Sequence, residues 1–348
     1  MHRGHRMSFF LLVAKETRAK ETRVALIPAD VATLVKDGHS VFVEHGAGIS
    51  AGYTDQEYIN AGASIRHIDD LTLQSYKQLF AGITHIVRVK RPERDREILE
   101  AQAIQSGTHL IGALDPYEKG SHHYREYEQA GIIAHSIDQL SLSHDDPMNL
   151  LASMSKIAGQ LAMQDAISKC QRAIKKVVII GFGVAGKSAF AEAISNQLSV
   201  TAILQSNTHA TAILEQGANV VLLSEKTSVV ERQAIIAYEL ATADIVITSA
   251  RKANERAPLL VPETTLQQMQ AGSVIVDLAL SEGGNVAGSK HDTNLILGNQ
   301  VIVTNVSGYP KNKPRESSIQ WSKSSLLFLQ HEAEAAKTNV LAINRSRL

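Results

Sequence analysis

The sequence contains a single cysteine, Cys170, among 348 residues. One cysteine excludes an internal disulfide framework and a zinc site built from several cysteines, and it is typical of the reducing cytoplasm, where we expect the protein to act. An excess of one charge is also missing, because 35 Lys and Arg residues are balanced by 35 Asp and Glu residues. This balance argues against nucleic acid or an anionic membrane surface as the main partner, since both select basic proteins.

Long apolar runs are absent as well. No segment approaches the roughly 20 apolar residues that cross a bilayer, so we expect no direct membrane insertion. The run Ser8–Ala14 ends at Lys15 and is too short for a signal peptide, so we expect it to contain a buried strand. The histidines are scattered, and the pair His122 and His123 lacks the spaced partners of a zinc site, so we predict no bound metal.

Short aliphatic segments alternate with helix-length segments along the whole chain. This alternation is typical of α/β proteins with mainly parallel sheets that helices bury on both faces. The length of 348 residues suggests two such domains. The expected strands are Phe9–Val13, Ser40–Glu44, Ile83–Val89, His109–Leu114, Ile132–Ala134, Val177–Ile180, Val200–Leu204, Val220–Leu222, Ile245–Thr248, Val274–Leu278 and Val301–Val303.

Three longer segments have helical character. Pro28–Asp37 is amphipathic, and Leu150–Gln171 has few helix breakers and an apolar stripe, so it predicts a long helix that links two lobes. The last periodic segment, Ser317–Ala336, predicts a helix with a serine cap at Ser317 or Ser318. The prolines just before this segment indicate that the chain returns to the first lobe there.

The clearest chemical motif is a glycine-rich turn near the middle of the chain. The strand Val177–Ile180 runs into the pattern G-x-G-x-x-G, formed by Gly181, Gly183 and Gly186, and a helix rich in small residues follows. In such turns the first glycine permits a tight bend, the second lets a pyrophosphate approach the backbone, and the third allows close helix packing. The helix N-terminus favours the anion. We therefore predict a dinucleotide site here, with Val184 as a further contact.

The choice of dinucleotide stays open. An NAD site usually has Asp or Glu at the end of the second strand to bind the ribose. Here that strand, Val200–Leu204, is followed by Gln205, which can bind a ribose without charge, and no Arg lies beside it to attract a 2′-phosphate. The cofactor is therefore NAD or NADP. Two alternatives also stay open: a packing turn with no ligand, and a P-loop, since Gly181–Ser188 formally fits that pattern with Asp277 as a magnesium ligand.

Several motifs resemble, in the same order, those of the family that contains alanine dehydrogenase and the NAD(P) transhydrogenase α subunit. The motifs are Ala14–Pro28, Gly46–Gly48, Tyr53–Ala63, Ser153–Gly159, Gly181–Gly186, Ala257–Leu260 and Ala271–Asn285. The resemblance implies a catalytic lobe made from both chain ends, residues 7–140 and 308–348, and a Rossmann lobe, residues 141–307, inserted between them. It also implies a homo-oligomer.

The resemblance also implies site residues. Arg23 in R-V-A-L-I-P and Lys90 in V-K-R-P match the residues that hold a keto acid, and an Arg fork suits a carboxylate while Lys polarises a carbonyl. Asp115 stands where alanine dehydrogenase has its catalytic His, so we predict Lys90 and Asp115 as catalytic, although Asp115 equally suits a turn before Pro116. The predicted cofactor-binding residues are Ser155, Gly181, Gly183, Val184, Gly186, Gln205, Ala250, Leu280 and Ser281, the last in place of a family Asp.

Three functions follow from these observations and stay open. The first is an oxidoreductase that transfers hydride between NAD(P) and a small 2-oxo acid or amino acid held by Arg23 and Lys90, like alanine dehydrogenase. The second is a soluble NAD(H)-binding component of a transhydrogenase, from whose loop pattern this chain departs at His144, Asn149 and Ala152. The third is a nucleotide-binding module that has lost catalysis.

Overall fold

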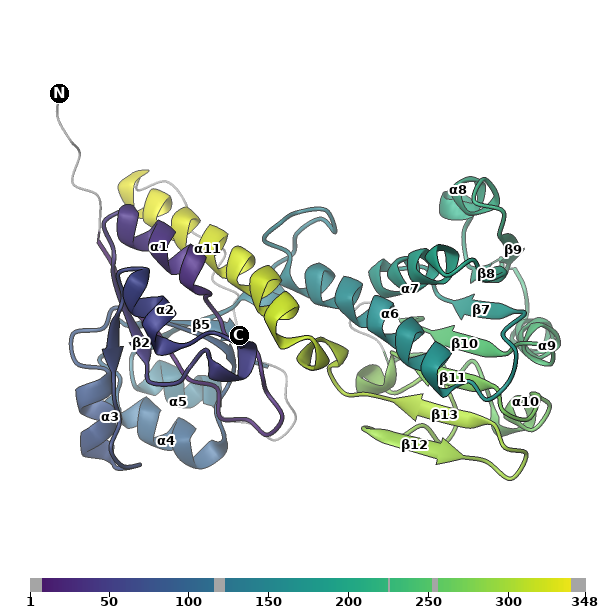
Figure 1. Ribbon diagram of the computed structural model, residues 1–348, viewed down its shortest axis with the longest axis horizontal. Helices are drawn as coiled ribbons and strands as arrows, with labels where there is room; N and C mark the ends of the chain where they lie inside the picture. The colour runs from purple at the N-terminus through teal and green to yellow at the C-terminus, as the bar shows by residue number, and fades with distance from the viewer. Residues whose placement is uncertain (1–7, 116–122, 225, 252–255, 339–348) are drawn as a thin grey trace. The chain divides into compact units, whose positions relative to one another are not determined.

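The computed structural model describes residues 8–115, 123–224, 226–251 and 256–338. The chain divides into two compact units: unit 1 is Met1–Met154 with Lys311–Leu348, and unit 2 is Ser155–Pro310. Each unit has an α/β architecture with a mainly parallel sheet, so the predicted fold class is confirmed (Figure 1). None of the helices within these described ranges is long and apolar enough to cross a membrane.

In the described part of unit 1, a six-stranded parallel sheet has the order β3-β2-β1-β4-β5-β6. Its strands are β1 (Phe10–Val13), β2 (Ser40–Glu44), β3 (Ser64–Arg66), β4 (His85–Lys90), β5 (His109–Ala113) and β6 (Ile133–Ser136). The helices of this unit are α1 (Pro28–Lys36), α2 (Asp55–Asn60), α3 (Leu73–Leu79), α4 (Arg94–Ala103), α5 (His123–Gln129) and α11 (Pro314–Thr338).

The sheet of unit 2 has seven strands among the described residues, in the order β12-β13-β11-β10-β7-β8-β9, and only β12 is antiparallel to its neighbour. Its strands are β7 (Val177–Ile180), β8 (Val200–Leu204), β9 (Asn219–Leu222), β10 (Ile245–Thr248), β11 (Val274–Asp277), β12 (Thr293–Ile296) and β13 (Ile302–Asn305). The accompanying helices are α6 (Leu150–Lys169), which begins in unit 1, α7 (Val184–Ser195), α8 (Ala210–Leu214), α9 (Val229–Leu240) and α10 (Glu263–Leu266).

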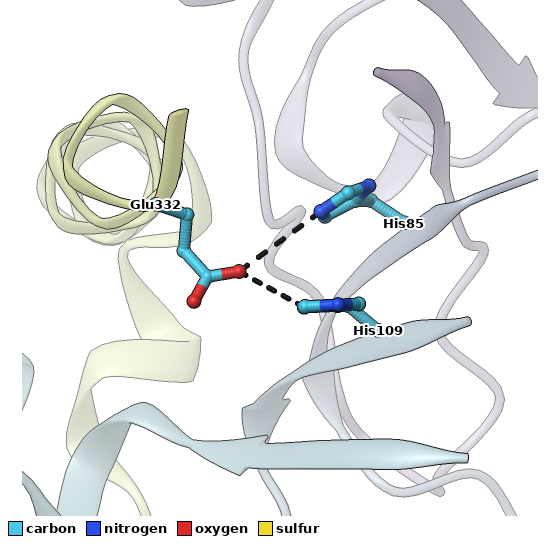
Figure 2. A group of neighbouring side chains, drawn as sticks. All are labelled: His85, His109 and Glu332. Atoms are coloured by element: carbon cyan, nitrogen blue, oxygen red, sulfur yellow. Dashed lines mark hydrogen bonds and ion pairs between the residues drawn. The ribbon is translucent and has the colours of Figure 1, made fainter. Parts of the chain in front are cut away.

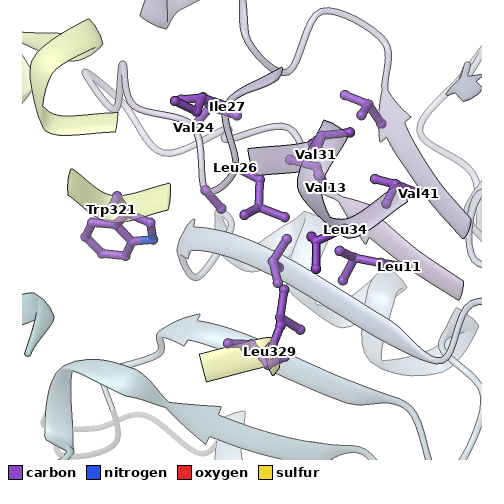
Figure 3. Close-up of a cluster of buried hydrophobic side chains, with 14 of the residues drawn as sticks. Leu11, Val13, Val24, Leu26, Ile27, Val31, Leu34, Val41, Trp321 and Leu329 are labelled. Carbon is purple, nitrogen blue, oxygen red and sulfur yellow. The ribbon is translucent and has the colours of Figure 1, made fainter. Parts of the chain in front are cut away.

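The core of unit 1 is built from both ends of the chain. Leu11 of β1 and Leu34 of α1 belong to the same buried cluster as Trp321 and Leu329 of α11 (Figure 3). This burial of apolar surface is the main force that holds the C-terminal helix against the N-terminal strands. Hydrogen bonds add to it, because the hydroxyl of Ser318 accepts the Val24 N–H at 3.0 Å.

The serine cap predicted for α11 is wrong. The helix begins at Pro314, and Ser317 and Ser318 lie within its first turns, where the Ser318 hydroxyl donates to the Pro314 carbonyl. Proline suits the first helical position because its missing N–H has no partner there in any helix.

The sequence did not predict two of the strands, β3 and β12. Both β3 and β12 lie at sheet edges, and each is short and contains polar residues beside one or two aliphatic ones. The pattern of a fully buried strand is therefore missing from them.

Candidate functional site

Both sheets contain a point at which the order of the strands reverses. In unit 1 this point lies between β1 and β4, and in unit 2 it lies between β7 and β10. Connections leave toward opposite sides of the sheet there, which opens a crevice beyond the carboxyl ends of the strands, and ligands of open α/β sheets bind in that crevice. The candidate site residues of each unit follow these strands.

The glycine turn of unit 2 follows β7 and leads directly into α7. Gly181 has a φ of +91°, and a Cβ there would lie 2.7 Å from the Ala250 nitrogen. A Cβ on Gly186 would lie 2.1 Å from the Gly181 oxygen, so these two glycines are needed for packing. Gly183 differs, because it is exposed and a Cβ on it would meet no described atom within 4 Å. The backbone at Gly183 is therefore open to a pyrophosphate beside the first N–H groups of α7.

The structure does not support the P-loop alternative. The helix α7 begins at Val184, so most of the Gly181–Ser188 string is already helical and does not form a loop around a phosphate chain. Asp277, the formal magnesium ligand, is fully buried, and its carboxylate accepts the backbone N–H groups of Ala279 and Asn285. Burial raises the pKa of Asp277 while these hydrogen bonds oppose the rise. The Asp277 carboxylate therefore stabilises the loop that follows β11 through these hydrogen bonds.

The other predicted cofactor residues gather at the same edge of the sheet. Gln205 follows β8, Ala250 follows β10, and Leu280 and Ser281 lie in a short 3-10 helix after β11. These strands are neighbours of β7 and parallel to it, so their carboxyl ends meet.

Two further contacts hold the surroundings of the turn in place. The side chain of Asn285 fixes Ala250, since it accepts the Ala250 N–H and donates to its carbonyl. On α6, a Cβ at Gly159 would lie 2.0 Å from the Ala185 oxygen, so α6 and the start of α7 pack closely. Ser155 lies one helical turn before Gly159 on the same face of α6, which directs it toward that region.

In unit 1, a cluster of charges lies beyond the carboxyl ends of β1, β4 and β5. Lys90 ends β4, and its Nζ is 3.1 Å from Oδ1 of Asp115. Arg18 comes from the segment after β1, and its guanidinium is 3.2 Å from Oδ2 of the same carboxylate. All three side chains are about 30% exposed, with values of 28%, 32% and 27% for Lys90, Arg18 and Asp115. Two cations thus lie around one carboxylate at partly exposed positions that a small anion can reach.

Asp115 has an unusual backbone conformation for this role. Its φ is +47°, in the left-handed region, where Asp is one of the few residues without glycine's freedom that is tolerated. The bend directs its carboxylate between Lys90 and Arg18. Pro116, which follows, lies outside the described residues.

The structure does not place Arg23 in this cluster, and the joint clamp of Arg23 and Lys90 stays a prediction. Nε and an NH2 nitrogen of Arg23 donate to the two oxygens of Glu21, each at 2.7 Å, so its fork already holds a carboxylate of the chain. Both side chains are buried, and the guanidinium also lies 4.8 Å from the ring centre of Trp321. Although burial alone would raise the pKa of Glu21, the bonds from Arg23 lower it.

Two residues of this region were missed by sequence reasoning, Arg18 and Glu16. The motif K-E-T-R occurs twice, as Lys15–Arg18 and Lys20–Arg23, and the family motif drew attention only to the second copy. Because the motif is repeated, Arg18 and Arg23 were both candidates for binding the substrate carboxylate.

Glu16 supports the end of β4 from behind. Its two carboxylate oxygens accept the backbone N–H groups of Val89 and Lys90 at 2.6 and 3.0 Å. Burial raises the pKa of Glu16 to about 7, against the opposing effect of the Arg88 guanidinium. The Glu16 carboxyl group therefore changes charge near neutral pH, in direct contact with the backbone of Lys90.

This pKa predicts a pH dependence of stability. Because the folded-state pKa, about 7, lies above the ordinary value of 4.5, Glu16 stabilises the fold below about pH 4.5 and loses that contribution as the pH rises through 7. The loss amounts to at most about 3 kcal/mol. Urea unfolding of wild type and Glu16→Gln from about pH 5 to pH 8 measures it, and the variant should show the smaller decline. Glu128→Gln, at an exposed position of α5, is the control; identical declines in wild type and Glu16→Gln would contradict the assignment.

These features define a class: a two-unit α/β protein with a dinucleotide-type turn in one unit and a cation–carboxylate cluster in the other. Models of the alanine dehydrogenase/PNT N-terminal and C-terminal domains match residues 12–158 and 153–346. The chain belongs to this family, and the resemblance seen in the sequence is confirmed. Family members of both branches are NAD(P)-dependent oxidoreductases, and this is the class of the protein.

Similar proteins come from both branches of the family. Alanine dehydrogenase of Methanococcus maripaludis is 31% identical over 79% of this chain and 73% of its own length. NAD(P) transhydrogenase subunit alpha of Cereibacter sphaeroides is 29% identical over 87% of this chain and 61% of its own length. The solved structure of a transhydrogenase from Sinorhizobium meliloti superposes with a TM-score of 0.81 at 28% identity, covering 93% of this chain and 94% of that one.

Proposed function

We propose that the protein transfers hydride between NAD(P) and a small 2-oxo acid or amino acid, as an alanine-dehydrogenase-like enzyme. The observation that carries this proposal is the cluster of Lys90, Arg18 and Asp115 at the carboxyl edge of the unit 1 sheet. It offers two cations and one carboxylate at partly exposed positions, and this set matches a substrate with a carboxylate, a carbonyl and an exchangeable proton.

Each residue of the cluster has a distinct proposed role. The planar guanidinium of Arg18 binds the substrate carboxylate, while the Lys90 ammonium donates a hydrogen bond to the carbonyl oxygen and stabilises the negative charge that develops there. Asp115 lies within hydrogen-bond distance of both and exchanges a proton with the substrate nitrogen or oxygen. Arg23 is a positioning residue, because it holds the segment after β1 through Glu21.

The cofactor residues of unit 2 bind and orient. The turn from Gly181 to Gly186 holds the diphosphate against backbone N–H groups, and Gln205 lies where a ribose is bound in such sites. When bound, the nicotinamide supplies or accepts the hydride.

A substrate panel tests the proposal. Small 2-oxo acids with ammonium are offered to the full chain together with NADH or NADPH, and oxidation is followed by the loss of nicotinamide absorbance. We expect turnover with at least one 2-oxo acid and one of the two nucleotides. Binding of nucleotide without turnover on any substrate would favour the degenerate nucleotide-binding module instead.

The transhydrogenase function is the second candidate, because a structure from that branch superposes with a TM-score of 0.81. Transfer of hydride from NADH to a nucleotide analogue, with no dependence on a 2-oxo acid, would support it. Asn149 argues against this function, because its side chain is already hydrogen-bonded at the start of α6. Its oxygen accepts the Ala152 N–H, and its amide donates to the carbonyls of Leu142 and Ser143.

A cytoplasmic location and a homo-oligomer stay predictions. Sedimentation of the purified protein tests the oligomeric state.

A further inference from the structure

The opposite edge of the unit 1 sheet carries a second cluster of side chains with no part in the proposed reaction. His85 and His109 are the first residues of β4 and β5 and lie side by side in the register of these parallel strands. Glu332 reaches them from α11, as Figure 2 shows. Its Oε2 atom is 2.9 Å from Nδ1 of His109 and 4.0 Å from Nε2 of His85. Two ring nitrogens thus converge on one carboxylate oxygen.

The protonation of His85 makes this convergence informative. Its other nitrogen, Nδ1, lies 2.9 Å from the hydroxyl of Thr84, and that hydroxyl donates to the carbonyl of Phe10. In the tautomer of His85 that has its proton on Nδ1, the Thr84 hydroxyl accepts that N–H, and the Nε2 lone pair faces the Glu332 carboxylate oxygen at 4.0 Å. This is the tautomer in which Nε2 can bind a metal ion.

A cation between His85 Nε2 and the Glu332 carboxylate would be attracted by both groups. We propose that His85 Nε2, His109 Nδ1 and Glu332 Oε2 bind a divalent transition-metal ion of the zinc class, and that this ion fastens α11 to the sheet. Two imidazoles and a carboxylate are a ligand set that zinc uses, whereas Mg²⁺ and Ca²⁺ prefer oxygen ligands alone. Zinc-bound atoms lie about 2.0–2.2 Å from the ion, which places tetrahedral ligand atoms about 3.3 Å apart. The distances of 2.9 and 4.0 Å lie on either side of that value.

The surroundings also suit a metal. The side chains of His85 and Glu332 are only 5% and 9% exposed, so water competes little for these ligands. The Thr84 hydroxyl lies 2.9 Å from the other ring nitrogen of His85, the position that outer partners of metal-bound histidines occupy. Binding of the ion through His109 Nδ1 requires the imidazole proton of His109 to lie on Nε2, and it involves no change of oxidation state. His135 lies beside these three residues, and its Nε2 atom is 3.1 Å from Nδ1 of His109.

The first test uses the unaltered, untagged full chain after removal of metals with a chelator. Zn²⁺ uptake is measured by competition with a chromophoric chelator, Co²⁺ by its visible absorption, and Mg²⁺ serves as the hard cation for comparison. We expect one equivalent of Zn²⁺ per chain, visible Co²⁺ bands that Zn²⁺ abolishes, and no competition from Mg²⁺. Crystals soaked in Zn²⁺ should show anomalous density between the three side chains. No stoichiometric uptake, or density only elsewhere, would overturn the proposal.

The second test uses matched variants. Glu332→Gln keeps the size of the side chain but removes its charge, and we expect Zn²⁺ affinity to fall by about 10–100-fold or more, since even loss of an outer partner has that effect. His291→Gln removes an exposed histidine of unit 2 and should bind Zn²⁺ like wild type. Equal affinity in wild type and Glu332→Gln would overturn the assignment. The site is independent of the proposed oxidoreductase function.

Discussion

Replacement of Lys90 by Met is expected to lower kcat/KM for the 2-oxo acid by about 10²–10³-fold, the usual effect of removing one donor from a developing oxyanion. Lys90 ends β4 with its side chain 28% exposed and its ammonium 3.1 Å from Asp115, so replacing it should leave the packing of the sheet intact. Nucleotide affinity should not change, because the proposed nucleotide contacts belong to unit 2. Steady-state kinetics on the most active 2-oxo acid and a nucleotide titration measure the two quantities.

Two further variants sharpen the test of Lys90. Lys77→Met removes an exposed lysine of α3 in the same unit and should leave kcat/KM unchanged. Arg18→Lys should raise KM more than it lowers kcat, since an ammonium cannot bind a carboxylate with two parallel hydrogen bonds. Turnover by Lys90→Met equal to that of wild type would remove this lysine from the reaction.

Replacement of single glycines in the turn after β7 should separate folding from binding. In Gly186→Ala the new Cβ would lie 2.1 Å from the Gly181 oxygen, a backbone atom that cannot move aside easily. We expect a loss of about 3 kcal/mol or more in the free energy of unfolding. In Gly183→Ala the backbone φ of −73° suits alanine and the Cβ meets no described atom within 4 Å, so stability should change by less than about 0.5 kcal/mol.

Gly183→Ala, which should leave stability almost unchanged, should weaken dinucleotide binding. The Cβ of Gly183→Ala occupies the space through which a pyrophosphate reaches the backbone, so affinity for NAD(H) or NADP(H) should fall at least about tenfold although the protein is folded. Urea unfolding and calorimetric titration of the same samples measure both effects. A folded Gly183→Ala protein with wild-type affinity would contradict the placement of the diphosphate.

The buried parallel strands and the glycine turn were predictable because their signals are local. Val177–Ile180 and Val274–Leu278 are continuous aliphatic runs, and the spacing of Gly181, Gly183 and Gly186 follows from one turn and one helix. The structure confirms these strands within a residue of the predicted bounds.

Features that depend on long-range contacts were not predictable. The choice between Arg18 and Arg23 as the substrate-binding residue depends on where the segment after β1 folds back, and the pairing of Arg23 with Glu21 is the contact that favours Arg18. In the cluster of His85, His109 and Glu332, the glutamate lies 223 residues after His109 in the chain, so no motif spacing reveals the cluster. The alignment of two histidines at the starts of neighbouring parallel strands was the only local sign.

The most direct measurement is a calorimetric titration of the full chain with NADH and with NADPH. We predict saturable binding of one of the two at one molecule per chain, together with a rise in the melting temperature by mass action. A folded protein that binds neither coenzyme would contradict the account, since every proposed catalytic role depends on a coenzyme held at the turn after β7.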